Sequence, residues 1–240
     1  MKLTIVFAGS VPKDDAPDYA NEDSFACDAA AQRFCMSDGA GQSYAPALWA
    51  DMLTRAWVQQ TGVVATAKGM EGVIERFNQE CGAENLSWSR AAAFERGTFA
   101  TLLGLRLREN RLRVLALGDS LMVITSPEGN VATFPYDDAE AFDTAPQLLS
   151  TLPAANRVFT PRTLRDRARV WKITRNTQVL LMTDALGCWL LKHQADEPSR
   201  ARLADIRTGE ALAEFVHTER SRGTLKTDDT TLVHLITEAS

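Results

Sequence analysis

The sequence has little of what marks a nucleic-acid-binding, membrane-spanning or zinc-dependent protein. Its 26 lysine and arginine residues are outnumbered by 31 aspartate and glutamate residues, which gives a net charge of −5. The clustered basic face that nucleic-acid binding needs is therefore not expected. No apolar run approaches the roughly 20 residues of a membrane span. His193, His217 and His234 show no HxH or HExxH spacing, which disfavours a zinc hydrolase. We expect neither nucleic acid nor a membrane as a partner.

Cysteine is also scarce, and this bears on the cellular compartment. The four cysteines are Cys27, Cys35, Cys81 and Cys188, and no two of them form a CxxC pair. Isolated cysteines are more often buried free thiols than metal ligands or disulfide partners, and Cys27 and Cys35 lie in apolar, strand-like segments. Residues 1–9 alternate like a strand, and their apolar part is too short for a signal peptide. A reducing cytoplasm is the expected location.

What the sequence does contain is enough apolar material for a large core. Hydrophobic residues make up 45% of the 240 positions, an ordinary value for a globular protein. No internal repeat or low-complexity linker divides the chain, so we interpret residues 1–240 as a single domain. Apolar runs bounded by polar or glycine residues predict strands. The predicted strands are 3–8, 24–28, 33–37, 98–108, 111–117, 121–125, 131–134, 168–174, 178–183 and 230–236.

Helices are predicted between these strands, where apolar residues recur at helical spacing. They cover residues 44–60, 71–81, 186–194, 199–206 and 209–220, the first behind a possible Ser43 cap. Glu109 and Asn110 are typical of a tight hairpin turn, and residues 127–130 indicate another. Antiparallel strands with inserted helices predict sheet layers covered by helices, which is an α+β fold.

Five short acidic segments are spread along the chain, most of them directly beside an apolar run. They are residues 21–23, 38–41, 118–120, 183–185 and 228–231. Carboxylates that converge at strand ends repel one another and raise each other's pKa. A hard divalent cation removes that conflict, since Mg²⁺ and Mn²⁺ prefer oxygen ligands from a few carboxylates and from a substrate phosphate. The segments therefore predict a site for divalent cations.

In their order along the chain and in their residue sequences, the acidic segments resemble the motifs of the PPM-type metal-dependent protein phosphatases, the protein phosphatase 2C class. The chain is similar to a compact, bacterial member of that family. The similar segments are 21–25, 34–41, 97–101, 117–120, 180–184 and 227–233. Each motif is weak alone, and the shared order of all of them makes the resemblance specific. It covers nearly the whole chain. It implies a four-layer α-β-β-α sandwich of two antiparallel sheets flanked by helices.

The resemblance also implies a binuclear Mn²⁺ or Mg²⁺ site with three catalytic aspartates. By that match Asp38 bridges the two cations, and Gly39 offers its backbone carbonyl to one of them. Asp184 and Asp228 hold the other cation. Two cations roughly 3.5–4 Å apart can lower the pKa of a shared water and aim the hydroxide at phosphorus. The implied activity is hydrolysis of phosphoserine or phosphothreonine in a protein that a Ser/Thr kinase has phosphorylated.

The resemblance also implies roles near the cations for four further acidic residues. Glu22 binds a cation directly or through water, and Asp119 lies near a third, looser metal position. For Asp119 the alternative is a side chain that caps a β-turn. Asp23 is expected to hydrogen-bond a metal-bound water or its own loop. Asp229 is expected to be a supporting or turn residue.

The sequence departs from the family pattern around the substrate phosphate. Asp18 stands where many members carry a phosphate-binding arginine, and Lys13 is the nearest upstream cation that can replace it. Ala40 replaces a histidine that is a candidate general acid, Leu121 replaces an arginine, and Ala185 replaces a glycine. These departures leave two alternatives open. One is a phosphatase-like binding or regulatory module, and the other is a hydrolase of small phosphoesters at the same site.

Overall fold

The computed structural model describes residues 1–14, 21–82, 87–157 and 159–239. Most of its strands form two five-stranded antiparallel sheets. The first sheet has, in spatial order, β1 (Lys2–Val11), β12 (Thr230–Glu238), β11 (Gln178–Met182), β7 (Leu121–Thr125) and β8 (Val131–Phe134). The second has β10 (Ala168–Lys172), β6 (Arg111–Leu117), β5 (Leu102–Arg108), β3 (Arg33–Asp38) and β2 (Asp23–Asp28). A short ribbon pairs β4 (Phe99–Ala100) with β9 (Leu149–Ser150).

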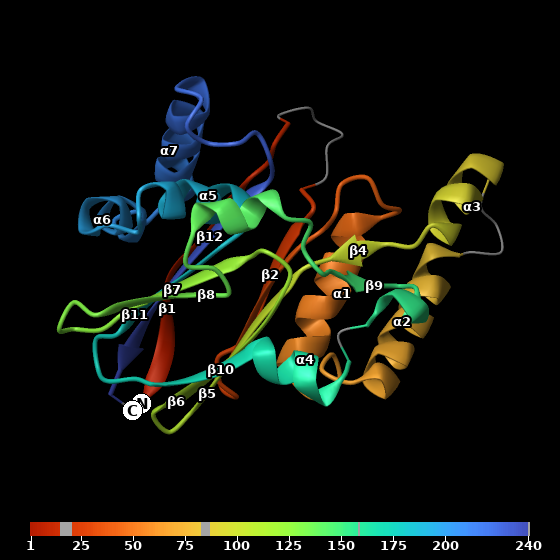
Figure 1. The fold of residues 1–240 in the computed structure, drawn as a ribbon, viewed down its shortest axis with the longest axis horizontal. Helices are drawn as coiled ribbons and strands as arrows, with labels where there is room; N and C mark the ends of the chain where they lie inside the picture. Colours follow the sequence, from red (N-terminus) through yellow and green to blue (C-terminus); the bar gives the residue numbers. More distant parts are fainter. Residues whose placement is uncertain (15–20, 83–86, 158, 240) are drawn as a thin grey trace.

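Helices flank the pair of sheets on both outer sides (Figure 1). The first sheet is covered by α5 (Asp184–Lys192), α6 (Glu197–Ala204) and α7 (Gly209–Ser221). The second is covered by α1 (Pro46–Gln59) and α2 (Ala67–Cys81). The remaining helices are α3 (Trp88–Glu95), α4 (Pro161–Asp166) and the 3₁₀ turns η2 (Ala139–Asp143) and η3 (Pro153–Ala155). Among the described helices, none has the length and apolar character needed to cross a bilayer.

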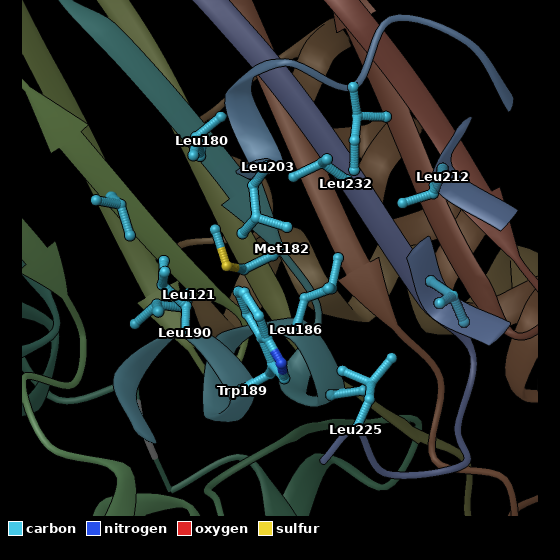
Figure 2. Packing of buried hydrophobic residues seen from close by; sticks show 14 of the residues in the cluster. Leu121, Leu180, Met182, Leu186, Trp189, Leu190, Leu203, Leu212, Leu225 and Leu232 are labelled. Atoms are coloured by element: carbon cyan, nitrogen blue, oxygen red, sulfur yellow. The ribbon is translucent and has the colours of Figure 1, made fainter. Parts of the chain in front are cut away.

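Three apolar clusters fill the spaces between these layers. Figure 2 shows the first, where Trp189 of α5 packs beside Leu121 and Met182 of the first sheet. Phe34 and Leu181 belong to the second cluster, between the two sheets. The third lies under α1 and α2. Alternate residues of a strand point to opposite faces, so the second sheet contributes to two clusters at once. Three clusters separating four layers confirm the expected α-β-β-α sandwich.

The ends of several elements differ from the sequence-based expectation. The strand expected over 98–108 is interrupted at Thr101, whose backbone N–H donates to the carbonyl of Asp38 at 2.8 Å. The first helix begins at Pro46, and Ser43 does not cap it, because its hydroxyl donates to the carbonyl of Ala40 at 2.6 Å. The helices α3 and α4 were not predicted, since each is too short to show a sustained apolar period.

One expectation about the cysteines was wrong. Cys35 is fully buried, but Cys27 is exposed. Cys27 lies in β2, an edge strand of the second sheet, where the residue parity turns its side chain outward. The two expected hairpin turns are confirmed. Glu109 adopts a φ of 55° between β5 and β6, and Gly129 a φ of 86° between β7 and β8.

Candidate metal centre

The centre of the candidate site is Asp38, the last residue of β3. Asp23, the first residue of β2, is its partner across the two strands, so two carboxylates meet at one end of the second sheet. The backbone of Asp38 is held on both sides. Its N–H donates to Thr101 Oγ1 at 2.9 Å, and Thr101 Oγ1 also contacts Ser120 Oγ at 2.8 Å. The turn that carries Asp119 is thereby tied to the end of β3.

Gly39 follows Asp38 at a point where no side chain fits. A Cβ atom there would lie 2.8 Å from the backbone of Pro46 and 2.9 Å from the carbonyl oxygen of Glu22. The Gly39 N–H donates to that same Glu22 carbonyl at 3.1 Å. Glycine is therefore needed here for the close approach of two backbone segments, which keeps Glu22 beside Asp38.

Asp23 is held by two threonines, Thr231 of β12 and Thr183, which lies between β11 and α5. Its Oδ2 accepts hydrogen bonds from Thr231 Oγ1 at 2.6 Å and from Thr183 Oγ1 at 3.1 Å. Its Oδ1 is buried and has no hydrogen-bond partner. Burial raises the pKa of Asp23 to about 8, with a further contribution from the charge of Asp229. The carboxylate of Asp23 is thus costly to ionise in the absence of a cation.

Asp229 supports the backbone of the N-terminal segments. It is 3% exposed, and its two carboxylate oxygens accept hydrogen bonds from the backbone N–H groups of Lys13 and Glu22, both at 2.8 Å. Through these bonds the residue directly before β12 fixes the backbone at Lys13 and Glu22. Its contacts are those of a positioning residue.

Asp184 and Asp228 converge on one ammonium group. Lys226 Nζ lies 2.9 Å from Asp184 Oδ2 and 2.7 Å from Asp228 Oδ2. Although burial opposes its charge, the hydrogen bonds to Asp228 and Asp184 raise the pKa of Lys226 above the ordinary value. A second lysine also pairs with an acidic residue of the site, since Lys13 Nζ lies 2.7 Å from Glu22 Oε2.

The negative charges of this edge act on one another. Burial raises the pKa of Asp38 well above its ordinary value, and the charges of Asp23, Asp184, Asp119 and Asp228 raise it further. Burial followed by the charge of Asp184 likewise raises the pKa of Asp119 to about 6. The fold therefore brings the five aspartates from separate acidic segments within electrostatic reach of one another.

The donor set fits a divalent cation in its chemistry. The buried Oδ1 atoms of Asp23 and Asp184 have no hydrogen-bond partner, and unpartnered buried carboxylate oxygens are what a hard cation satisfies. The present side-chain arrangement is not closed around a cation, because within the described ranges no three acidic, histidine or cysteine side chains surround one point. Lys226 and Lys13 pair with three of the carboxylates instead.

Comparison with known proteins identifies the fold. The manganese-bound catalytic domain of the serine/threonine phosphatase PstP superimposes with a TM-score of 0.63 at 16% identity, covering 98% of each chain. Stp1, a serine/threonine phosphatase from Staphylococcus aureus, gives 0.62 at 13% identity, covering 100% of this chain and 96% of its own. This chain has the fold of the PPM-type serine/threonine phosphatases. PppA, a regulatory component of the type VI secretion system in Pseudomonas aeruginosa, gives 0.59 at 18% identity, with 98% of each chain covered.

Sequence comparison alone does not detect the similarity to PPM-type phosphatases. No protein-family model matches the chain, and no curated protein matches it at a significant level. The identities of 13–18% to these solved structures show how far the sequences have diverged while the fold is kept.

The departures from the PPM-type pattern have structural counterparts. Leu121, in place of an arginine, is fully buried in the cluster beneath α5 and takes no part in the carboxylate edge. Ala40 has its N–H bonded to the carbonyl of Phe99 at 2.9 Å. Asp18 lies outside the described residues. The expected arginine and histidine functions are therefore not supplied at positions 40 and 121.

Several residues to which the sequence pattern assigned no role are brought to the site by the fold. Thr183 and Thr231 hold Asp23, Thr101 and Ser120 hold the Asp38 segment, and Lys226 links Asp184 to Asp228. A signal was present for Lys226, because a lysine two residues before Asp228 adds a positive charge to an acidic segment. Nothing in the local pattern indicated which carboxylates it would contact.

Proposed function

We propose that this protein is a metal-dependent phosphatase that hydrolyses phosphoserine or phosphothreonine in protein substrates phosphorylated by a Ser/Thr kinase. The observation that carries the proposal is the group of aspartates around Asp38 at the sheet edge, two of which have a buried oxygen without a partner. The likeness of the fold to bacterial serine/threonine phosphatases supports it.

In this proposal Asp38 would help to hold both of two Mn²⁺ or Mg²⁺ ions, the Gly39 carbonyl would hold one, and Asp184 and Asp228 would hold the other. When bound, the cations supply an activated water and neutralise the phosphoryl oxygens. Glu22 would help to hold the first cation, directly or through a water. Asp119 is assigned to a looser third position.

The supporting roles follow from contacts on this chain. Asp23 orders the edge through Thr183 and Thr231, and Asp229 fixes the backbone of Glu22. Lys13 is proposed to bind the substrate phosphate, and its side chain has to leave Glu22 to do so. Since residue 40 is alanine, the leaving serine or threonine oxygen takes its proton from water.

The test compares two substrates with and without metal. We expect Mn²⁺-dependent release of phosphate from a phosphothreonine peptide, abolished by EDTA and by Asp184→Asn. Release of p-nitrophenol from p-nitrophenyl phosphate without peptide turnover would instead identify a hydrolase of small phosphoesters. Full peptide turnover in excess EDTA would contradict the metal-dependent mechanism.

A phosphatase-like binding or regulatory module is the second candidate. The observation that favours it is the pairing of Lys226 and Lys13 with carboxylates that an active enzyme uses for cations. Such a module would bind the phosphothreonine peptide in a fluorescence anisotropy titration and turn over neither substrate at any Mn²⁺ concentration.

A further inference from the structure

Lys226 lies in the segment between α7 and β12, directly before the last acidic motif. Its ammonium group bridges two carboxylates that are 44 positions apart in the sequence, those of Asp184 on α5 and Asp228. The carboxylates are largely withdrawn from solvent, with side-chain exposures of 17% and 31%, whereas the lysine side chain is 60% exposed. The charged end therefore points into the site while the stem remains at the surface.

The ammonium group and a divalent cation need the same oxygens. Under the proposed function, Asp184 and Asp228 are the two aspartates that hold the second cation. A cation at hydrogen-bond distance from both Oδ2 atoms excludes another cation from that position, since the two positive charges would repel at short range. The other oxygen of Asp184, Oδ1, remains buried and without a partner. Lys226 thus provides a hydrogen-bond partner for only one of the two oxygens of the Asp184 carboxylate.

We propose that Lys226 is an internal competitor for the second metal ion. In the metal-free protein its ammonium group holds Asp184 and Asp228 together and reduces their mutual repulsion. When a divalent cation binds, the side chain moves into solvent without losing its proton. This inference rests on the proposed function, because it takes Asp184 and Asp228 as metal ligands.

The position of Lys226 makes this exchange physically simple. The residue lies outside helices and strands, and most of its side chain already faces water. Only the ion pairs must break, and no part of the core has to repack. The apparent affinity of the second site is lowered by the fraction of molecules in which the lysine occupies it. Occupancy of that site then depends on the cellular concentration of free metal.

Arg222 provides a matched control for Lys226. It is also a basic residue after α7, its side chain is 61% exposed, and its guanidinium lies 3.1 Å from a buried carboxylate, that of Glu219. Neither Arg222 nor Glu219 belongs to the carboxylate edge. Lys226→Met and Arg222→Met therefore remove the same charge from equally exposed positions, and only the first removes the competitor.

The first experiment is a calorimetric titration of the full chain with Mn²⁺ alone. Lys226→Met is expected to tighten the weaker Mn²⁺ site on the order of tenfold, as expected when a competing conformer populated at about 90% is removed. Arg222→Met is expected to leave both sites unchanged. Equal Mn²⁺ affinities in wild type and Lys226→Met would overturn the proposal while leaving the metal site itself intact.

The second experiment measures the accessibility of the Lys226 amine in the wild-type protein. It distinguishes displacement of Lys226 by metal from a general effect of removing one positive charge. Limited acetylation is measured by peptide mass spectrometry with and without saturating Mn²⁺, using the exposed Lys68 of α2 as the internal reference. The ratio of Lys226 to Lys68 labelling is expected to rise several-fold with metal, because the amine leaves its two carboxylates. An unchanged ratio in protein shown to have bound two Mn²⁺ would overturn the proposal.

The outcomes also distinguish this inference from the proposed function. Binding of Mn²⁺ by Lys226→Met and not by wild type would support the competitor role in its strongest form. Failure of both proteins to bind Mn²⁺ would contradict the metal-dependent function, and the competitor role with it.

Discussion

Glu219 and Asp23 are both carboxylates with buried oxygens, yet the surroundings of Glu219 stabilise its negative charge and those of Asp23 destabilise it. Glu219 on α7 is 3% exposed and accepts hydrogen bonds from Arg202, Trp189 and Thr224 at 2.6–3.0 Å. Burial opposes its charge, but these hydrogen bonds outweigh it and lower the pKa of Glu219 to about 2. At Asp23 burial prevails and the pKa rises to about 8.

The difference separates two uses of a buried charge. The protein supplies every partner that Glu219 needs, so this carboxylate joins α6 to α7 without any external group. At the Asp23 and Asp38 edge the protein supplies acidic neighbours, and buried oxygens remain unpartnered. An arrangement that costs stability in the absence of a ligand is typical of a functional site. Perturbing each region tests this contrast.

The largest expected effect is on metal binding at Asp38. Asp38→Asn keeps the size of the side chain and removes the charge that the two cations would share under the proposed function, so Mn²⁺ affinity is expected to fall about 10³-fold, or about 4 kcal/mol. Because the change also relieves carboxylate repulsion, thermal stability in EDTA is expected to hold or increase. Calorimetric titration and thermal unfolding measure the two quantities. A loss of stability in EDTA with unchanged Mn²⁺ affinity would make Asp38 a structural residue.

The second effect is the pH dependence of stability in EDTA. Folded Asp23 has a pKa of about 8 against 3.8 for the ordinary value, so the folded state holds a proton that the unfolded state has released. The free energy of unfolding is therefore expected to fall as pH rises, by roughly 2 kcal/mol between about pH 5 and about pH 7. Urea unfolding at each pH measures this slope, and Asp23→Asn should reduce it, while the raised pKa values of Asp38 and Asp119 account for the slope that remains. A slope identical in Asp23→Asn would assign the effect to other groups.

Glu219 is expected to show the opposite behaviour. Its folded pKa is lowered, so its contribution is present above pH 4.5 and is lost as pH falls toward about 2. Glu219→Gln is expected to cost about 1–2 kcal/mol of stability at neutral pH, since one charged acceptor is replaced by a neutral one. Mn²⁺ affinity should stay at the wild-type value. A reduced Mn²⁺ affinity would show that the two regions are coupled.

The smallest effect is expected at the solvent-exposed partner of Glu219. Arg222→Met removes an ion pair whose basic side chain is 61% exposed, and such pairs contribute little. The free energy of unfolding is expected to change by at most about 0.5 kcal/mol. A change above about 1 kcal/mol in urea unfolding would mean that Arg222 carries more of the Glu219 interaction than its exposure suggests.

Much of the fold could be predicted from local sequence patterns. The long strands β5 and β6 alternate between two clusters, and their hairpin turn is marked by Glu109 and Asn110. The short elements could not be predicted, because α3, α4 and β9 have too few residues for a repeating apolar pattern. The exposure of Cys27 depended on β2 being an edge strand, which its own sequence does not indicate.

The candidate site was predictable only in part, for a related reason. The acidic segments stand in the sequence beside apolar runs, so their position at strand ends follows from local pattern. The threonines that hold Asp23 are Thr183 and Thr231, which lie 160 and 208 positions after it in the sequence. The order of strands in the two stacked sheets determines which residues meet at the site. That order cannot be predicted from the sequence of a single segment.

The sequence by itself determined where the carboxylates occur, how the strands alternate and which residues departed from the phosphatase pattern. Only the tertiary structure decided that Asp23 has an oxygen without a partner, that Glu219 is fully satisfied, and that Lys226 binds Asp184 and Asp228. Alternation and turn chemistry act between neighbours in the chain, whereas the partner of a charge is set by distances in space. Those distances exist only once both sheets and their covering helices have packed.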